Sequence, residues 1–191
     1  MRITAGRLKG HPLIVPEGQI IRPTSDKVRQ AIFNVLEHHD FGADFELEHS
    51  RVIDLFAGSG ALGLEALSRG ASYAILIDNL GESRATLRSN VEAMELTGVT
   101  KIWRRNATDL GRNINEPFDL AFLDPPYGKN LLVPALSSLQ IGGWLQPHAI
   151  VVTEAARGED IPSTDSFQLL KEKYYGMTKV SFWRPILVQT A

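Results

Sequence analysis

From residue 51 onward, short runs of apolar residues alternate with segments whose apolar residues recur every three or four positions. Short apolar runs predict strands at 52–56, 74–78, 101–105, 118–123 and 149–154. Segments with apolar residues three and four positions apart predict helices between them, at 61–69, 82–96 and 131–139. Strands that alternate with helices predict a parallel sheet that is covered by helices on both faces.

The C-terminal part departs from this alternation. Residues 167–174 and 178–188 are two extended runs joined by Tyr175-Gly176-Met177. Strands joined by so short a loop pair antiparallel. The pattern therefore predicts an α/β fold whose mostly parallel sheet ends in an antiparallel hairpin.

The N-terminal part predicts a small appendage to this sheet. Residues 2–8 and 11–15 have the pattern of a short β-hairpin with its turn near Gly10. A helix should follow, capped by Thr24 or Ser25. Its apolar positions form one stripe, made of Val28, Ala31, Ile32, Val35 and Leu36. The polar stretch from His38 to Ser50 predicts a linker, so we expect an appendage over residues 1–38 and a main domain over 39–191.

Composition excludes several classes of site. The chain of 191 residues has no cysteine, which excludes disulfides, thiolate metal sites and cysteine nucleophiles. Its five histidines show no metal-ligand spacing, so we predict no metal site. The sequence shows no signal-peptide pattern and no apolar run of membrane-spanning length. We therefore expect a cytoplasmic protein without a membrane partner.

Charge is distributed unevenly along the chain. The formal net charge is −2, but residues 1–29 carry six basic against two acidic residues, leaving 14 against 20 for the rest. The basic residues of this segment are Arg2, Arg7, Lys9, Arg22, Lys27 and Arg29. A basic arm on an acidic body suggests a polyanionic partner such as a nucleic acid. The alternative is a basic edge that only faces solvent.

A glycine-rich loop follows the first predicted strand of the main domain. Residues 57–63 read Ala-Gly-Ser-Gly-Ala-Leu-Gly, a G-x-G-x-x-G pattern between a strand and a helix, with an acid twenty positions after its first glycine. Glycines there permit a tight turn and a close approach of the backbone to a ligand, and the acid can accept both hydroxyls of a ribose. The residues expected to bind a nucleoside-type ligand here are Phe56, Gly58, Ser59, Gly60, Asp78 and Asn79. The alternative is that the glycines only allow the helix to pack on the strand.

The glycine loop alone does not choose between nucleoside ligands. NAD would place a pyrophosphate at the helix N-terminus, and a dehydrogenase normally needs a second mononucleotide-binding half. S-adenosylmethionine has no phosphate but has a charged methionine end, for whose ammonium group Asp54 is well placed. Asn106 can offer its side-chain carbonyl to an adenine amine, and Ala107 its backbone N–H to a ring nitrogen.

The motif Asp124-Pro125-Pro126-Tyr127 favours S-adenosylmethionine. It follows the strand expected to lie next to the first, where open α/β sheets bind their ligands. An exocyclic amine of a nucleobase is a poor nucleophile, and two acceptors on its N–H bonds turn its lone pair toward a methyl group. The Asp124 carboxylate and the Pro125 carbonyl can be those acceptors, held rigid by the prolines, while Tyr127 can stack on the base. The alternative is a plain surface turn.

The chain resembles a known family in five blocks. These are "MRITAGRLKG", "RPTSDKVRQAIFNVL", "DLFAGSGALGLEALSRGA", "DPPY" and "YYGMTKV", which in this order resemble the RsmD family over nearly the whole chain. The resemblance implies the Rossmann-like class I methyltransferase fold, with a seven-stranded sheet and S-adenosylmethionine as methyl donor. It also implies methylation of N2 of a loop guanine in 16S ribosomal RNA, in an assembled or assembling small subunit.

Two positions depart from the family pattern, because Asp78 stands where the family usually has Glu, and Asn106 where it usually has Asp. For the appendage, the resemblance makes Arg22 and Thr24 of the "RPT" block candidates for contact with RNA near the target. Arg7, Lys9 and Arg2 are weaker candidates for phosphate contacts. Arg22 could instead form an ion pair that ties down the arm. Tyr175 and Trp183 could stack on a base, although packing is the more common role of such residues.

Three other functions remain open. The motif around Asp124 also suits adenine-N6 methylation of nucleic acid and glutamine-N5 methylation of protein, and the fold could serve as a non-catalytic nucleotide- or RNA-binding module. The basic arm favours a nucleic acid over a protein substrate. An intact Asp-Pro-Pro-Tyr motif argues against a pure binding module, which would not need acceptors aimed at an amine.

Overall fold

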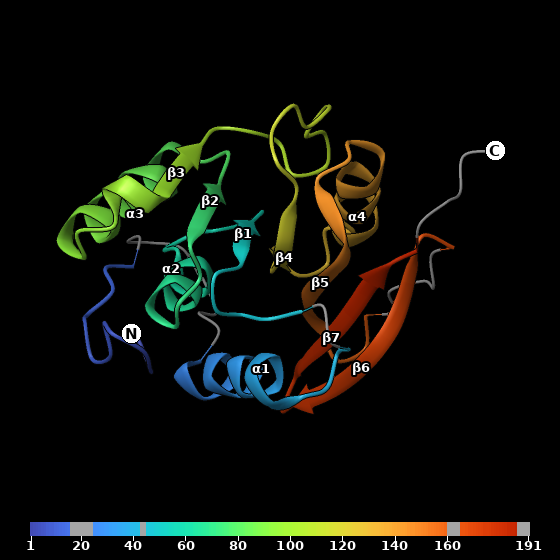
Figure 1. Cartoon of the computed structure of the whole chain (residues 1–191), viewed down its shortest axis with the longest axis horizontal. Helices are drawn as coiled ribbons and strands as arrows, with labels where there is room; N and C mark the ends of the chain where they lie inside the picture. The colour runs from blue at the N-terminus through green and yellow to red at the C-terminus, as the bar shows by residue number, and fades with distance from the viewer. Residues whose placement is uncertain (16–24, 43–44, 160–164, 187–191) are drawn as a thin grey trace.

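The computed structural model describes residues 1–15, 25–42, 45–159 and 165–186, and its centre is one seven-stranded sheet (Figure 1). The strands are β1 (Arg51–Asp54), β2 (Tyr73–Ile77), β3 (Thr100–Trp103), β4 (Phe118–Leu123), β5 (Leu145–Ala156), β6 (Phe167–Tyr175) and β7 (Thr178–Pro185). Their order across the sheet is β3-β2-β1-β4-β5-β7-β6. Strands β1 to β5 pair in parallel, whereas β7 is antiparallel to both β5 and β6. This confirms the predicted fold class, including the C-terminal hairpin.

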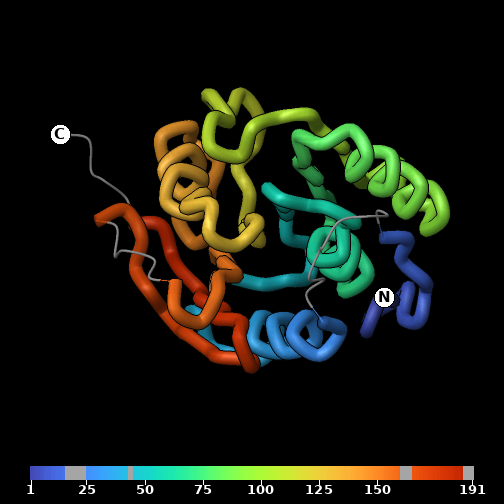
Figure 2. Tube along the Cα trace, turned by 180° about the vertical axis from the view of Figure 1, so that it is seen from behind, coloured from blue at the N-terminus to red at the C-terminus, as the bar shows by residue number. Residues whose placement is uncertain are grey.

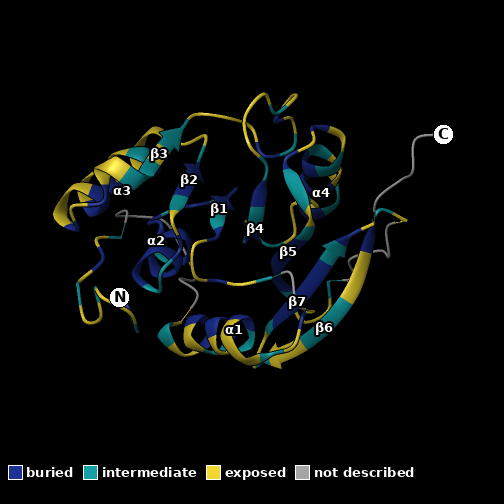
Figure 3. Ribbon diagram, viewed as in Figure 1, coloured by how far each residue is buried: buried dark blue, intermediate teal, exposed yellow. Residues whose placement is uncertain are grey.

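Helices cover both faces of the sheet, as predicted. They are α1 (Asp26–His38), α2 (Ala61–Ser68), α3 (Gly81–Ala93) and α4 (Leu132–Ile141), with a short 3-10 helix at Thr97–Val99. One buried cluster joins α1, α2 and α3 to one face, and a second joins α4 and the segment before β4 to the other. Figure 3 shows that the central strands and α2 are buried, whereas α3 and the edge strand β6 are largely exposed or half-exposed. Within the described residues, no helix is long and apolar enough to cross a membrane.

Strand β5 begins four residues earlier than the hydrophobic pattern predicts. Apolar burial starts at Ala149, and the polar stretch before it reaches the sheet through the pair Phe118–Leu145. The register between β4 and β5 then shifts before the regular ladder from Leu120 onward. A pattern based on burial misses such a half-exposed extension because its side chains do not alternate in polarity. The predicted end of the last strand, at 188, lies outside the described residues.

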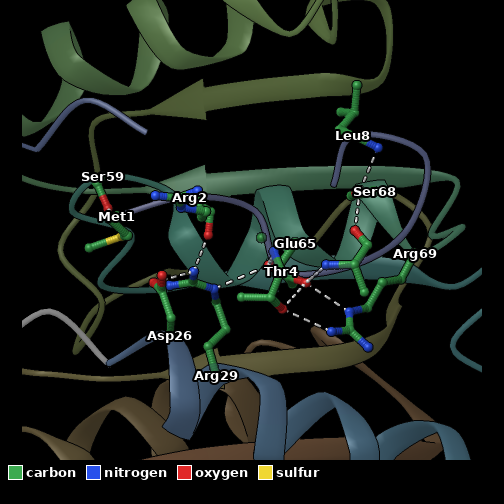
Figure 4. A network of polar contacts seen from close by, with 12 residues as sticks. Met1, Arg2, Thr4, Leu8, Asp26, Arg29, Ser59, Glu65, Ser68 and Arg69 are labelled. Carbon is green, nitrogen blue, oxygen red and sulfur yellow. Dashed lines mark hydrogen bonds and ion pairs between the residues drawn. The ribbon is translucent and has the colours of Figure 1, made fainter. Parts of the chain in front are cut away.

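The N-terminal arm, residues 1–15, reverses direction as predicted but is not a regular hairpin. Its only strand-type pairing within the described residues is one antiparallel bridge between Arg2 and Pro12. Ile3 bonds to Gly10 and His11 across the arm, but other residues between Arg2 and Pro12 bond to α2. Thr4 N–H donates to the Glu65 carboxylate at 2.9 Å, and Leu8 N–H to the Ser68 hydroxyl at 3.0 Å. Figure 4 shows the arm running along α2 in this way.

Helix α1 packs on the same core as the arm. Ser25 is its N-cap and accepts from the Val28 N–H at 3.2 Å, which settles the predicted choice of cap within the described residues. Arg29 is fully buried on the packing face, because its guanidinium donates to the buried Glu65 carboxylate of α2 at 3.1 Å. The arm, α1 and α2 therefore share one core rather than forming a loosely attached unit.

Candidate active site

A cavity of about 890 Å³ opens at the carboxyl ends of the parallel strands. Figure 2 views the chain from the side opposite to Figure 1. The cavity is lined by the following residues that the sequence had singled out: Asp54, Phe56, Gly58, Ser59, Asp78, Asn79, Asn106, Ala107, Asp124, Pro125, Pro126 and Tyr127. The structure thus brings together the glycine loop, the acids after β1 and β2 and the proline motif after β4.

The glycine loop is held in place by two acids of the sheet edge. Gly58 has a φ of +54°, a conformation that favours glycine, and its N–H donates to Asp78 Oδ2 at 3.0 Å. The N–H of Gly63 donates to Asp54 Oδ2 at 3.2 Å. Gly60 does not line the cavity; with a φ of +83° it precedes α2, where a side chain would meet Leu87 at 2.8 Å. Gly60 therefore serves packing, whereas Gly58 faces the cavity.

Asp78 combines support of the loop with a place for a ligand. Its Oδ1 accepts the N–H of Leu80 at 2.8 Å, and its Oδ2 accepts that of Gly58. Each carboxylate oxygen has two lone pairs, so both can also accept hydroxyl hydrogens from the cavity side. Asn79, next to Asp78, is exposed at the cavity rim.

The pKa of Asp54 is strongly perturbed by its surroundings. Only 2% of its surface is exposed. Burial raises the pKa of Asp54 from 3.8 to about 7, and the negative charges of Asp124 and Asp78 act in the same direction, whereas the backbone N–H groups of Gly63 and Phe56 lower it. A buried carboxyl in this state favours a cationic ligand, whose charge compensates the ionised form.

Asn106 forms a local turn at the end of β3. Its side-chain oxygen accepts from the Thr108 N–H at 3.1 Å and from the Thr108 hydroxyl at 2.9 Å. A nucleobase amine would have to share this oxygen. Ala107 is buried and lines the cavity, and the exposed Arg105 lines it too, with its guanidinium 4.9 Å from the centre of the Trp103 ring.

The proline motif leaves β4 beside β1. The two strands pair in parallel with Asp54 opposite Phe122, so that Asp124 emerges next to the glycine loop. Asp124 is half-buried, Pro125 is buried and Pro126 is exposed. The hydroxyl of Tyr127 lies 3.3 Å from that of Thr178, at the start of β7. The motif is thus an anchored edge of the cavity and not a plain surface turn.

The polar groups of the cavity fit a nucleoside that carries a charged amino-acid end. Three acids line it, and the Ser83 hydroxyl, which also lines it, is buried without a hydrogen-bond partner in the part of the chain that the structure describes. A buried orphan hydroxyl beside a cavity is a natural contact for a polar ligand. No cluster of three potential metal ligands occurs among the described residues.

Of the four residues predicted to bind RNA, the structure describes two, Arg7 and Lys9. Arg7 and Lys9 are exposed. They lie at the end of α2 that is remote from the glycine loop, because the Arg7 N–H donates to the carbonyl of Ser68, the last residue of α2. Figure 4 shows Leu8 beside Ser68 at one end and Met1 beside Ser59 at the other. Arg22 and Thr24 lie outside the described residues.

Two aromatic residues that were weighed for base stacking differ in exposure. Trp183 is buried, and its indole N–H donates to the Thr153 hydroxyl at 2.9 Å, so it serves packing. Tyr175 is half-buried against the α1-side core, and burial raises the pKa of its hydroxyl. Neither ring is therefore available as an open platform.

Several residues at the site were not predicted from the sequence. Met1, Ser83, Arg105 and Leu131 line the cavity, and Met1 reaches it because the arm lies along α2. Behind the glycine loop, the buried Asn90 side chain of α3 donates to the Ser59 carbonyl at 2.8 Å and also pairs with the backbone of Ile14. Long-range contacts place Met1, Asn90 and Ile14, so no local pattern could have shown them.

Comparisons with known proteins cover nearly the whole chain. A family model described as conserved hypothetical protein 95 matches residues 1–184. Ribosomal RNA small subunit methyltransferase D of Haemophilus influenzae is 32% identical over 96% of this chain and 93% of its own. The protein of the same name from Escherichia coli is 33% identical over 92% of this chain and 85% of its own. The solved structure of Escherichia coli yhhF has a TM-score of 0.79, with 31% identity and 97% of each chain covered. These similarities confirm the predicted family and the Rossmann-like class I fold.

Proposed function

The chain belongs to the family that this model describes, the RsmD family, and from that premise we propose that it methylates the exocyclic N2 amine of a loop guanine in small-subunit ribosomal RNA. The methyl donor is S-adenosylmethionine. The observation that carries this proposal is that Asp54, Asp78 and Asp124 line one cavity at the switch point of the sheet. One cavity can thus hold both a charged nucleoside and an amine acceptor.

Three parts of the chain would hold the cofactor. Asp78, which holds the glycine loop, would accept the ribose hydroxyls, and the loop glycines would let the backbone approach the ligand. Asp54 would face the ammonium group of the methionine end, whose positive charge would favour the ionised form of this buried acid. Asn106 and Ala107 line the adenine side. When bound, the cofactor supplies an activated methyl group on a sulfonium centre.

Asp124 and the Pro125 carbonyl orient the guanine amine. As acceptors of its two N–H bonds, they turn the nitrogen lone pair toward the methyl group, and positioning of this kind can lower a barrier by about 7–11 kcal/mol. Attack of the lone pair forms the N–C bond as the C–S bond breaks, and the methylated nitrogen becomes cationic. Such a nitrogen loses its proton readily, so Asp124 acts as an orienter rather than as an obligatory base.

Substrate choice rests on the names of the relatives and on the arm. Relatives that cover this chain almost from end to end are named as methyltransferases of small-subunit ribosomal RNA. The exposed basic side chains of Arg2, Arg7 and Lys9 suit a polyanion. We place RNA contacts in the segment 1–38 and catalysis in 39–191, with an assembled or assembling small subunit as the substrate. The target base must be unstacked, which costs less in a loop than in a duplex.

Methyl transfer to isolated small subunits tests this function. Subunits from a strain that lacks the gene are incubated with the protein and tritiated S-adenosylmethionine, and the RNA is digested to nucleosides. Label in N2-methylguanosine is the expected result. Label in N6-methyladenosine would assign the adenine-directed activity instead, and label in protein the glutamine-directed one.

Substitutions at Asp124 test the mechanism in the same assay. Asp124→Ala should abolish turnover and leave cofactor affinity nearly unchanged, because the side chain faces the substrate. Asp124→Asn should keep a measurable fraction of the rate, since its carbonyl still accepts a hydrogen bond. Single-turnover rates across pH separate the roles: an inactive Asn variant, with a wild-type rate that follows one ionisation near neutral pH, would make Asp124 the base.

A further inference from the structure

The motif "YYGMTKV", residues 174–180, has no role in the site described so far. It forms the end of β6, the turn and the start of β7, and Tyr175 pairs with Thr178 across the hairpin. The turn is fastened to the candidate active site, because the Thr178 hydroxyl lies 3.3 Å from that of Tyr127. What the turn exposes is therefore presented from a position fixed relative to the proline motif.

Three exposed side chains gather at this turn, and we call Arg157, Tyr174 and Met177 the turn surface. Tyr174 is 49% exposed and Met177 59%. The exposed Arg157 places its guanidinium carbon 5.2 Å from the centre of the Tyr174 ring. Its backbone N–H donates to the Met177 carbonyl at 2.8 Å and its Nη1 to the Gly176 carbonyl at 3.3 Å, so the arginine is held against the turn.

One nearby acid, Glu172, is bonded to the hairpin itself. The carboxylate of Glu172 accepts from the Tyr174 hydroxyl at 2.5 Å and from the Ser181 hydroxyl at 3.1 Å. These bonds fix the edge of the tyrosine ring while its face meets the arginine. The exposed Tyr174 and Met177 side chains lie next to each other and are poorly hydrated, so they favour contact with a flat, partly apolar ligand. The neighbouring Arg157 favours a negative charge on that ligand.

The basic tip of the N-terminal arm is far from the proline motif, so it leaves the RNA on the other side of that motif without a contact from the arm. Arg7 and Lys9 lie at the end of α2 remote from the glycine loop, so the arm tip does not border the cavity. The turn surface lies on the other side of the proline motif, about three strand spacings or ~14 Å from β4. That separation is suited to a nucleotide that neighbours the target and not to the target itself.

We propose that the turn surface binds an unpaired nucleotide that flanks the target base in the substrate RNA. Tyr174 stacks on the base, Met177 covers its edge, and Arg157 contacts the adjoining phosphate. This rests on the proposed function for the identity of the RNA. Stacking on an aromatic ring is tolerant of sequence, and a single arginine contributes one phosphate contact. The turn surface then holds the strand on one side of the target while Asp124 receives the base.

RNA binding to the intact protein tests this without any methyl transfer. The probes are a short fluorescein-labelled RNA of mixed unpaired sequence and a hairpin RNA of the same composition, followed by anisotropy over a range of salt concentrations. Tyr174→Ala should weaken binding of the unpaired probe about tenfold with an unchanged salt slope, and Tyr174→Phe should restore it. Arg157→Ala should lower the salt slope by about 0.7, the value for one phosphate of a single strand. The matched control is Arg88→Ala, an exposed arginine on α3 beyond the opposite edge of the sheet, which should change neither.

Two outcomes overturn the turn surface as an RNA contact. One is that wild type and Tyr174→Ala bind the unpaired probe with equal affinity. The other is that the hairpin binds more tightly and only the substitution of Arg88 weakens binding.

The same variants are then assayed on small subunits, where a raised KM with unchanged kcat is expected. A wild type that binds the probe through Tyr174 but forms no N2-methylguanosine would refute the proposed function and leave the contact standing. If the wild type methylates guanine but the variants keep its KM and RNA affinity, the proposed function stands and the contact at the turn surface is refuted.

Discussion

The raised pKa of Asp54 predicts that cofactor binding depends on pH in a specific way. In the empty protein this carboxyl is half-protonated at about pH 7, because it is buried and lies near the negative charges of Asp124 and Asp78. An ammonium group beside it favours the ionised form. Binding should therefore release a proton from Asp54, and affinity should rise as pH increases toward 7.

The size of the effect follows from the pKa. The difference between 3.8 and about 7 corresponds to about 4 kcal/mol. Because the folded protein binds this proton more tightly than the unfolded chain, Asp54 favours the fold at low pH. That contribution is lost as pH rises from about 4 to about 7. At pH 6 roughly a tenth of Asp54 is ionised, so affinity should be about fivefold lower than at pH 7 and should fall about tenfold per pH unit below that.

Titration calorimetry measures both quantities. In two buffers of different ionisation enthalpy, binding of S-adenosylmethionine at pH 6 should release close to one proton per site, and at pH 7 about half a proton. Above about pH 8 the amino group of the ligand itself loses its proton, so affinity should pass through a maximum between these values. The comparison variant is Asp54→Asn, which keeps an acceptor for the Gly63 N–H but has no charge.

The Asn variant decides whether Asp54 is responsible. Its affinity should be lower than that of the wild type at pH 7.5 but independent of pH between about 5 and 7. Its stability should also lack the decline that the wild type shows between about pH 4 and 7 in urea unfolding. If the variant keeps the pH dependence of the wild type, or if the wild type releases no proton at pH 6, the assignment of the ammonium to Asp54 is wrong.

Asp78→Asn should weaken S-adenosylmethionine binding by about 1–3 kcal/mol in calorimetry, because charged acceptors of the ribose hydroxyls are lost; unchanged affinity in a folded variant would remove Asp78 from the site. Glu65→Ala leaves the buried Arg29 without its buried carboxylate, so the free energy of unfolding should fall by about 3–5 kcal/mol, and a loss below about 1 kcal/mol would contradict a stabilising role. Neutralising both Arg7 and Lys9 should flatten the salt dependence of RNA affinity by about two units, whereas an unchanged slope would make the arm a scaffold.

The candidate site was predictable because its acids are marked by local sequence. Asp54, Asp78 and Asp124 each come at or just after the end of a strand in a chain that alternates strands and helices. Carboxyl ends of parallel strands meet at one edge, so the pattern alone places the three acids together. The cavity that contains all three agrees with this reasoning.

The contacts of the N-terminal arm were not predictable in the same way. Glu65 lies within an otherwise apolar helix, and its partners Thr4, Ala5 and Arg29 are 36 to 61 residues away in the chain. A carboxylate at such a position normally points to solvent, and although Arg69 at i+4 is a local partner, nothing nearby in the chain indicates the buried pair with Arg29. For the same reason the hairpin pattern overestimated pairing within the arm: backbone groups that an isolated hairpin would pair internally bond to Glu65 and Ser68.

The support of the glycine loop explains why the site tolerates a costly acid. Asp54 and Asp78 accept N–H groups of the loop, so the conformation that receives a nucleoside is formed by the fold itself. Part of the roughly 4 kcal/mol carried by the Asp54 pKa is a penalty that the empty protein bears at neutral pH. A neutral residue at this position would make the ligand-free protein more stable. It would also lower the affinity for the ligand, because the ligand's ammonium group would be buried without a compensating negative charge. The buried carboxyl is therefore retained for binding, and its penalty is relieved only when a cation arrives.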